Sequence, residues 1–302
     1  MLISVIIPTK DRAQKLIRCL DSLEEQRLDK KNFEVIVVFN GNYDTLRSER
    51  YKRRLDIKFI EFNKVGAGLA RNHGAALAKG EYLAFIDDDC TASQDWLSKI
   101  NQYIKSKDKK KFAAVGGSVY PLNKNGSVIH RYLSYIEHLN GPIKDNGQII
   151  NLSSANLTIR KDIFVGIGGF DERLEVAAED QNLISRIIKN TPVDFCKEIS
   201  LFHDHDISFR DFKNKFRRYG YGVYEHYYFS KMPIAKNKIY IPYCKSLLGV
   251  IIRIPKICCD AWSLIIKPKK INLLFFPFAF IQEFYFQLGA KDAFKKYRTA
   301  LK

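Results

Sequence analysis

Residues 66–97 read GAGLARNHGAALAKGEYLAFIDDDCTASQDWL, and this stretch decides the expected fold. Its segment EYLAFI (81–86) is short and apolar, which is typical of a buried strand. Three carboxylates follow directly, at Asp87, Asp88 and Asp89. Adjacent acids repel one another unless solvent or a positive charge lies among them. Because ligands collect beyond the carboxyl ends of strands in open α/β sheets, we expect a ligand site here.

Strand-like and helix-like segments alternate along the first 200 residues. Short β-rich runs occupy 2–8, 33–39, 57–62, 81–86, 112–120, 153–160 and 193–202. Apolar residues recur with helical spacing in 12–26, 68–80 and 179–190. This order predicts an α/β fold whose mostly parallel central sheet is flanked by helices. The pattern weakens after about residue 230, where we expect a helical, amphipathic extension.

Composition limits the class of protein. The chain has 302 residues, of which 46% are apolar and 13% aromatic, so it is long and apolar enough to bury a core. Its six cysteines form no CxxC pair, which argues against a zinc ribbon or a disulfide framework and favours a reducing compartment. The start MLISVIIPTK lacks a basic segment and a long apolar run, so we expect a cytoplasmic catalytic part.

The net charge of +17 is concentrated near the end of the sequence. Residues 231–302 hold 14 Lys and Arg against 3 acids, an excess of +11. The longest uncharged run there, 271–282, contains Pro277 and is shorter than the roughly 20 residues that span a bilayer. Apolar segments with basic flanks predict peripheral binding to an anionic membrane surface. The alternative is that this extension packs on the catalytic domain or forms a homodimer contact.

A nucleic-acid partner is not expected despite the positive charge. We find no helix-turn-helix signature, zinc finger or RNP-like aromatic string, and the acidic site is unsuited to tracking phosphates.

The acidic run offers metal ligands. Asp87 and Asp89 form a DxD pair, and their side chains would point the same way if strand geometry continued through residue 89. Oxygen ligands on one side suit a hard cation such as Mg²⁺ or Mn²⁺. The alternative is a solvated acidic turn.

Five segments together carry a family resemblance. They are VIIPTKDR (5–12), EVIVVFNGN (34–42), the stretch 66–97, SSANLTIRKDIFVGIGGFDE (153–172) and AEDQNLISRI (178–187). The chain resembles the family 2 glycosyltransferases of GT-A fold that build bacterial cell-surface polysaccharides, in order over roughly residues 3–220. The resemblance implies an inverting, metal-dependent enzyme that moves a sugar from a nucleoside-diphosphate sugar to a saccharide or lipid-linked saccharide. The alternatives are transfer to a polyprenyl phosphate and an inactive nucleotide-sugar-binding module.

The resemblance also implies roles for residues at the strand ends. The nucleotide-sugar would be bound by the following residues: Pro8, Thr9, Asp11, Asn40, Arg71, Asp87 and Asp88. Many members have an aspartate where this chain has Asn40. The resemblance favours a UDP-sugar. Because an amide both donates and accepts whereas a carboxylate only accepts, this departure leaves thymine and guanine open as the base.

Further roles implied by the resemblance concern the metal and the acceptor. Asp89 would bind the metal, with His203 or His205 of the segment LFHDHDIS completing the coordination. Asp180 would be the general base, although acids at a helix start also favour the helix dipole. The acceptor would be bound by Asn156, Asp171 and Glu179.

We therefore expect a catalytic domain over residues 1–230. Within it, residues 1–115 would bind the nucleotide-sugar, and residues 116–230 would bind the acceptor. Residues 231–302 would form the basic amphipathic extension, on the inner face of the cell membrane.

Overall fold

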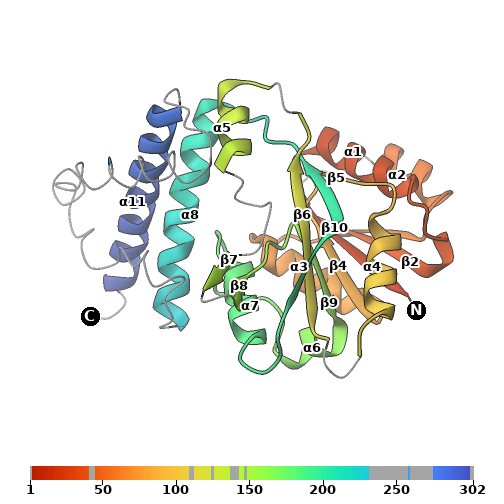
Figure 1. The fold of residues 1–302 in the computed structure, drawn as a ribbon. Coiled ribbons are helices and arrows are strands. Elements are labelled where there is room, and N and C mark those ends of the chain that lie inside the picture. Colours follow the sequence, from red (N-terminus) through yellow and green to blue (C-terminus); the bar gives the residue numbers. More distant parts are fainter. Residues whose placement is uncertain are drawn as a thin grey trace. The chain divides into compact units, whose positions relative to one another are not determined.

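The computed structural model describes residues 2–40, 45–108, 112–123, 126–136, 143–145, 148–230, 258 and 275–299. Its centre is an eight-stranded sheet, visible edge-on in Figure 1. The strands in sheet order are β3 (Ile57–Glu61), β2 (Phe33–Asn40), β1 (Ile3–Lys10), β4 (Tyr82–Ile86), β9 (Asn156–Arg160), β6 (Ala114–Pro121), β10 (Asp194–His203) and β5 (Cys90–Ala92).

The sheet combines parallel and antiparallel pairs. Strands β1 to β4 pair in parallel, as the alternation of strands and helices predicts. Strand β9 lies between β4 and β6 and is antiparallel to both, while β10 is parallel to β6 and antiparallel to β5. The α/β fold is therefore confirmed, with β9 and β5 as reversed strands. A separate hairpin pairs β7 (Ile143–Asp145) with β8 (Gln148–Asn151).

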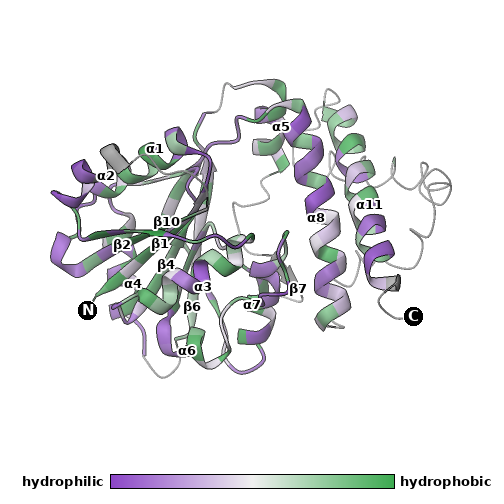
Figure 2. Ribbon diagram, turned by 180° about the vertical axis from the view of Figure 1, so that it is seen from behind, coloured by the Kyte–Doolittle hydropathy of each residue, from purple (hydrophilic) through white to green (hydrophobic). Residues whose placement is uncertain are grey.

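Helices cover both faces of the sheet. One apolar core joins the sheet to α1 (Ala13–Glu24), α2 (Thr45–Lys52) and α4 (Trp96–Lys105). The other joins it to α3 (Ala67–Leu77), α6 (Lys161–Gly166) and α7 (Glu179–Ile187). A short 3₁₀ turn, η1 (Lys30–Asn32), precedes β2. Strands covered on both faces need apolar residues at every position, which explains why EYLAFI shows no alternation and why the central strands are green in Figure 2.

A buried polar cluster fixes the amino-terminal end of the sheet, where β1, β2 and β4 begin. The backbone N–H of Gly80 donates to Ser4 Oγ (2.8 Å), and Ser4 Oγ donates to Glu34 Oε1 (2.7 Å). The backbone N–H of Lys79 also donates to Glu34 Oε1 (2.5 Å). A Cβ at Gly80 would lie 2.7 Å from the Leu2 carbonyl oxygen, so this position needs glycine. The turn formed by the segment KGEY (79–82) thereby sets where β4 begins.

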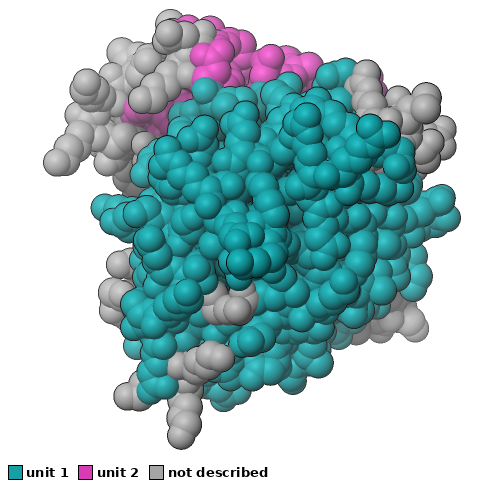
Figure 3. Space-filling model, turned by 90° about the vertical axis from the view of Figure 1, so that its right-hand side faces the viewer, with its two compact units in different colours: residues 1–122, 139–175, 180–204 teal, residues 123–138, 176–179, 205–302 magenta. Residues whose placement is uncertain are grey.

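The chain divides into two compact units, coloured separately in Figure 3. The first consists of 1–122, 139–175 and 180–204 and holds the eight-stranded sheet. The second consists of 123–138, 176–179 and 205–302. The predicted boundary at residue 230 therefore falls inside the second unit. It coincides with the end of α8 (Phe209–Ser230), which packs along α11 (Phe276–Thr299).

Aromatic contacts hold the second unit together. Helix α5 (Val128–Ile136) contributes Tyr132, which contacts the rings of Phe212 and Phe278 from the two long helices. A Cβ at Gly220 would clash with the Phe286 carbonyl, and one at Gly289 would clash with the Arg217 carbonyl. The backbones of α8 and α11 therefore approach closely at these two glycines.

None of the helices in the described part of the chain has the length and apolar character needed to cross a membrane. Most of the predicted extension, residues 231–257, 259–274 and 300–302, lies outside the described residues. Its described part includes α11, a helix as expected. Pro277 stands at the second position of α11, in the first turn, where a missing N–H costs no helical hydrogen bond.

Candidate active site

The three carboxylates that follow β4 lie in a turn and not in a continuation of the strand. Strand β4 ends at Ile86, and the backbone N–H of Cys90 donates to the carbonyl of Asp87 (3.0 Å). The alternation expected for Asp87 and Asp89 therefore does not extend to these residues, and each acid has its own partners. Thr9, at the end of the neighbouring β1, reaches this turn and donates to Asp88 Oδ2 (2.6 Å).

Asp87 pairs with a buried arginine. Arg71 Nη2 lies 2.6 Å from Asp87 Oδ1, and the Arg71 side chain is only 3% exposed. Its guanidinium lies over the ring of Phe170 at 5.5 Å from the centroid, while Asn72 exchanges two hydrogen bonds with the Phe170 backbone. The segments ARN (70–72) and GGFDE (168–172) thus contact each other. Arg71 is connected to the acidic turn by its contact with Asp87.

Asp88 is fully buried yet close to other charges. Besides Thr9, its carboxylate contacts Arg12, whose Nη2 lies 2.9 Å from Asp88 Oδ1. Burial raises the pKa of Asp88 to about 7; the neighbouring acids Asp89 and Asp87 add to the rise, while Arg12 opposes it. Its full burial gives Asp88 a role in holding Thr9 and Arg12.

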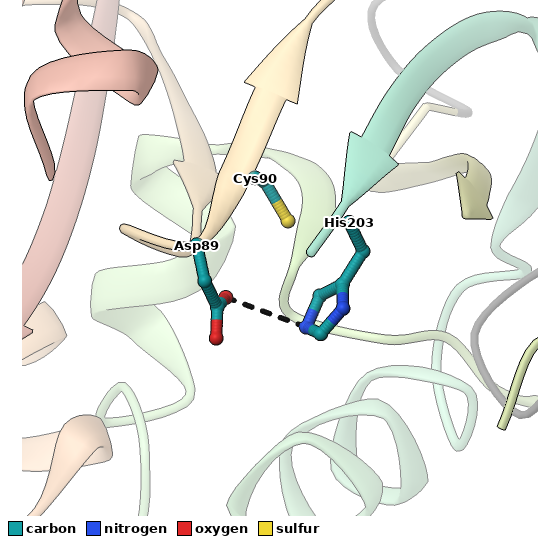
Figure 4. Close-up of side chains that lie close together, drawn as sticks. All are labelled: Asp89, Cys90 and His203. Carbon is teal, nitrogen blue, oxygen red and sulfur yellow. Dashed lines mark ion pairs between the residues drawn. The ribbon is translucent and has the colours of Figure 1, made fainter. Parts of the chain in front are cut away.

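Asp89 faces a histidine from a distant strand (Figure 4). Asp89 Oδ1 lies 3.3 Å from His203 Nε2, and its Oδ2 accepts a hydrogen bond from Arg12 Nη1 (2.6 Å). Burial alone would raise the pKa of Asp89, but His203, Arg12 and Lys15 outweigh it and hold the pKa well below its ordinary value. Asp89 is therefore an ionised carboxylate at neutral pH.

Strand pairing brings His203 to Asp89. Strand β10 pairs with β5, and His203 lies opposite Cys90 in that register. The backbone N–H of Asp204 also donates to the carbonyl of Asp89 (2.9 Å). Because β10 ends at His203, strand alternation does not continue to His205, and the strand does not place these two histidines on one face. His205 lies in the second unit, with its ring 5.7 Å from that of His130.

The spacing of Asp89 and His203 fits a divalent cation. Two ligand atoms about 2.1 Å from one ion and at right angles lie about 3 Å apart, close to the 3.3 Å observed. The Cys90 thiol belongs to the same cluster, in which one ligand atom from each residue lies within 4.8 Å of the others. Burial raises the pKa of Cys90, so it remains a neutral thiol, a poor ligand for hard cations. Asp89 and His203 are the residues that would hold Mg²⁺ or Mn²⁺.

Asp180 lies at the same end of the sheet as the acidic turn. It stands in the first turn of α7, where its Oδ1 accepts from the backbone N–H of Gln181 (2.7 Å) and its Oδ2 from that of Ser154 (3.4 Å). Ser154 precedes β9, in which Asn156 lies opposite Ile86 of β4. The start of β9 and the carboxyl-terminal end of β4 therefore lie at the same end of the sheet. Asp180 and the acidic turn both lie at this end.

The other predicted acceptor residues have different surroundings. Asn156 is 1% exposed and uses its whole amide, accepting from Trp96 Nε1 (3.0 Å) and donating to the carbonyls of Ser118 and Ile199 (both 2.9 Å). The structure thus gives Asn156 a role in joining strands. Asp171 accepts from Arg173 (2.6 Å), and Glu179 begins α7 half-buried.

The remaining predicted nucleotide residues follow β1 and β2. Pro8 is buried, and Asp11 is exposed with a left-handed backbone (φ 52°), a conformation few non-glycine residues adopt. The side chain of Asn40 lies outside the described residues. Sequence reasoning assigned no role to Arg12 or Cys90; the available signal was their position next to predicted site residues.

Comparisons with known proteins concern the family and the fold of the chain. The sequence model of Glycosyl transferase family 2 matches residues 4–168. Glycosyltransferase AglE of Haloferax volcanii is 32% identical over 182 residues, and the match spans 57% of this chain and 57% of AglE. The chain thus spans little more than half the length of this curated relative.

Solved structures share the fold. Mannosyltransferase PcManGT from Pyrobaculum calidifontis, in complex with GDP-Man and Mn²⁺, aligns with a TM-score of 0.58 and 16% identity over 99% of this chain and 75% of its own. TarS 1–349 of S. aureus, in complex with UDP-GlcNAc, aligns with a TM-score of 0.56 and 20% identity over 99% of this chain and 92% of its own.

Proposed function

The chain belongs to glycosyltransferase family 2, and from this premise we propose that it transfers a sugar, with inversion, from a nucleoside-diphosphate sugar to a saccharide or lipid-linked saccharide of a cell-surface polysaccharide. The observation that carries the proposal is the pairing of Asp89 Oδ1 with His203 Nε2 at 3.3 Å, at the end of the sheet where Asp180 also lies. One site then contains a cation-binding pair and a separate carboxylate for proton transfer.

On the donor side, we assign the nucleotide to the ends of β1, β2 and β4. Thr9, Asp11 and Asp87 supply polar groups, with Pro8 and Asn40 beside them. Arg71 and Asp88 act through their contacts with Asp87 and Thr9, because both are buried. A UDP-sugar is our first choice of donor. The two solved structures compared above hold GDP-Man and UDP-GlcNAc respectively, so the test must include both bases.

The leaving group is a diphosphate, whose negative charge grows as the sugar–phosphate bond breaks. Asp89 and His203 would hold a divalent cation, which would supply positive charge to stabilise this leaving group. The hydrogen bond from Arg12 occupies the second oxygen of Asp89, so Asp89 offers the cation mainly Oδ1.

On the acceptor side, Asp180 removes the proton of the attacking hydroxyl. That oxygen attacks the anomeric carbon from the face opposite the diphosphate, so the configuration inverts. The backbone N–H groups of Ser154 and Gln181 orient the Asp180 carboxylate. Asp171 and Glu179 are the acceptor contacts we propose, with Asn156 supporting the strand behind them.

The test is to offer the full chain UDP- and GDP-sugars, with a membrane lipid extract as the acceptor source. Mass spectrometry identifies the product, and NMR gives its anomeric configuration. We expect one donor to react, activity to disappear with EDTA and return with Mn²⁺, and the configuration to invert. Activity that survives thorough chelation contradicts the metal role, and retention of configuration contradicts the role of Asp180.

Asp180→Asn separates this function from transfer to a polyprenyl phosphate. A hydroxyl acceptor needs the base, so we expect kcat to fall about 100- to 10,000-fold. A phosphate acceptor is already ionised, and full activity of Asp180→Asn would indicate that class. If the wild type binds the nucleotide-sugar but shows neither sugar transfer nor donor hydrolysis, the chain is an inactive binding module.

We also propose that the chain attaches peripherally to the inner face of the cell membrane through the basic residues of 231–302. Because α11 packs on α8, truncation would expose apolar surface and confuse the assay. Flotation of the full chain should therefore compare phosphatidylglycerol-containing vesicles with neutral ones at low and high salt. Equal binding to both vesicles contradicts the proposal, and light scattering would identify a homodimer contact instead.

A further inference from the structure

Arg12 forms a bridge between two neighbouring carboxylates. Its Nη1 lies 2.6 Å from Asp89 Oδ2, and its Nη2 lies 2.9 Å from Asp88 Oδ1. Asp88 is fully buried and also accepts from Thr9, so its carboxylate is fixed. The guanidinium is therefore held against the carboxylate that we assign to the cation.

The backbone prevents Arg12 from moving far. Arg12 precedes α1, and its carbonyl accepts from the N–H groups of Lys15 and Leu16 (both 3.0 Å). The preceding Asp11 has the left-handed backbone noted above. The helix start thus keeps the Arg12 side chain beside the acidic turn, although this side chain is 45% exposed.

The other cations near the site contact other acids, and two of them share one carboxylate. Arg71 pairs with Asp87. Lys15 and Arg18 pair with Asp204, at 3.4 and 2.5 Å. The group thus sets four cations against four acids when all are ionised, so it has no net negative charge with which to attract a further cation.

A divalent cation at Asp89 would give this group of side chains a net positive charge. The cation and the guanidinium would contact the same carboxylate, and like charges repel strongly at a site that is mostly buried. A nucleoside diphosphate brings two or more negative charges, which would balance both cations. The cation is thus favoured together with the diphosphate and disfavoured without it.

We propose that Arg12 is a positioning residue that couples the two ligands, so that the site binds the cation weakly alone and tightly with a nucleoside diphosphate. This inference rests on the proposed function, because it takes Asp89 as the ligand of the cation. It assigns Arg12 a role in choosing the metal–diphosphate complex over the free metal. By linkage, the metal strengthens diphosphate binding by the same factor.

The test measures Mn²⁺ affinity by the EPR signal of free Mn²⁺, alone and with UDP or GDP, after correction for Mn²⁺–nucleotide complexes in solution. For Arg12→Gln we expect Mn²⁺ alone to bind about tenfold more tightly than to the wild type, equivalent to about 1.4 kcal/mol. The ratio of the two affinities, with and without nucleotide, should fall by about the same factor. Arg12→Met, which keeps the apolar stem, provides a second neutral variant should Arg12→Gln fold poorly.

Two controls isolate the charge of Arg12. Arg12→Lys keeps the charge and should retain most of the coupling. Arg18→Gln removes a similar exposed cation on the same helix and should leave Mn²⁺ affinity unchanged, because Arg18 pairs with Asp204.

The outcomes separate the inference from the function beneath it. If the neutral variants bind Mn²⁺ alone no better than the wild type, while the wild type still binds Mn²⁺ with nucleotide, the coupling role is wrong and the metal site stands. Weaker Mn²⁺ binding in both variants would show that Arg12 only supports the turn. If the wild type binds no Mn²⁺ with either nucleotide, the metal assignment and the inference both fail.

Discussion

The two ends of the central sheet both bury a carboxylate, and they treat it in opposite ways. At the amino-terminal end, Glu34 accepts from Ser4, from the Lys79 backbone and from Lys58, one acid among three donors. At the carboxyl-terminal end, three acids crowd one turn. The pKa of Glu34 is lowered because these hydrogen bonds outweigh its burial, whereas burial raises the pKa of Asp88 to about 7.

This difference shows how the fold separates stability from chemistry. A buried acid surrounded by donors stabilises the folded state, and its oxygens are already hydrogen-bonded within the protein and so do not need a ligand. A turn in which three acids lie together is costly to bury, so it is a natural site for a ligand that brings its own balancing charges, such as a metal–diphosphate complex. Ligand binding is expected at the end of the sheet where the acids lie close together.

The largest effect should come from Asp89→Asn. Loss of the carboxylate removes the proposed metal ligand that faces His203, and we expect kcat/KM to fall at least about 1,000-fold, roughly 4 kcal/mol of transition-state stabilisation. The melting temperature should also fall, because the folded state holds the pKa of Asp89 low and its ion pairs therefore stabilise the fold. Steady-state kinetics with saturating Mn²⁺ and differential scanning fluorimetry measure both, and near-normal activity would remove the basis of the contrast.

At the opposite end, Gly80→Ala should damage folding and not chemistry. The new Cβ would lie 2.7 Å from the Leu2 carbonyl oxygen and 2.7 Å from the Ser4 backbone nitrogen, so the strands must shift. We expect a loss of about 2–3 kcal/mol in the free energy of unfolding, measured with urea. Gly166→Ala is the matched control, because a Cβ added there would meet no atom within 4 Å. Equal stability of the two variants would argue against the role of the KGEY turn.

Glu34→Gln tests the acid among the donors. We expect about 2 kcal/mol of destabilisation at pH 7, because charged hydrogen bonds are lost. The pKa of Glu34 is lowered on folding, so its contribution is present above about pH 4.5 and is lost as the pH falls through its folded-state pKa. The difference between variant and wild type should shrink in acid, and a constant difference from pH 7 to pH 3 would contradict this account.

The smallest effect, of opposite sign, is expected for Asp88→Asn. The folded-state pKa of Asp88 is raised from 3.8 to about 7, so the folded protein binds a proton more readily and stability falls as the pH rises between these values. At pH 8 the variant should be more stable than the wild type by on the order of 1 kcal/mol, because part of the gain is offset by the lost pairing with Arg12. Melting temperatures from pH 4 to pH 8 check this, and a destabilised variant at pH 8 would show that pairing dominates.

Much of the fold could be predicted from local patterns. The runs 33–39 and 81–86 appear as β2 and β4 within a residue, and 12–26 and 179–190 contain α1 and α7. The family assignment is confirmed by the match over residues 4–168. Strand β9 between β4 and β6 was predicted as a strand, but its reversed direction depends on which neighbours it joins. Periodicity carries no information about that choice.

The site divides in the same way. The sequence by itself determined that acids follow a buried strand and that a second acidic pair begins a helix, because strand ends and helix starts are local features. The tertiary structure alone decided which acid meets which partner: His203 faces Asp89 only because β10 pairs with β5, and Arg12 reaches both Asp88 and Asp89 only because β1 lies beside β4. Contacts between residues far apart in the chain depend on strand order and register, which are set by the packing of the whole sheet.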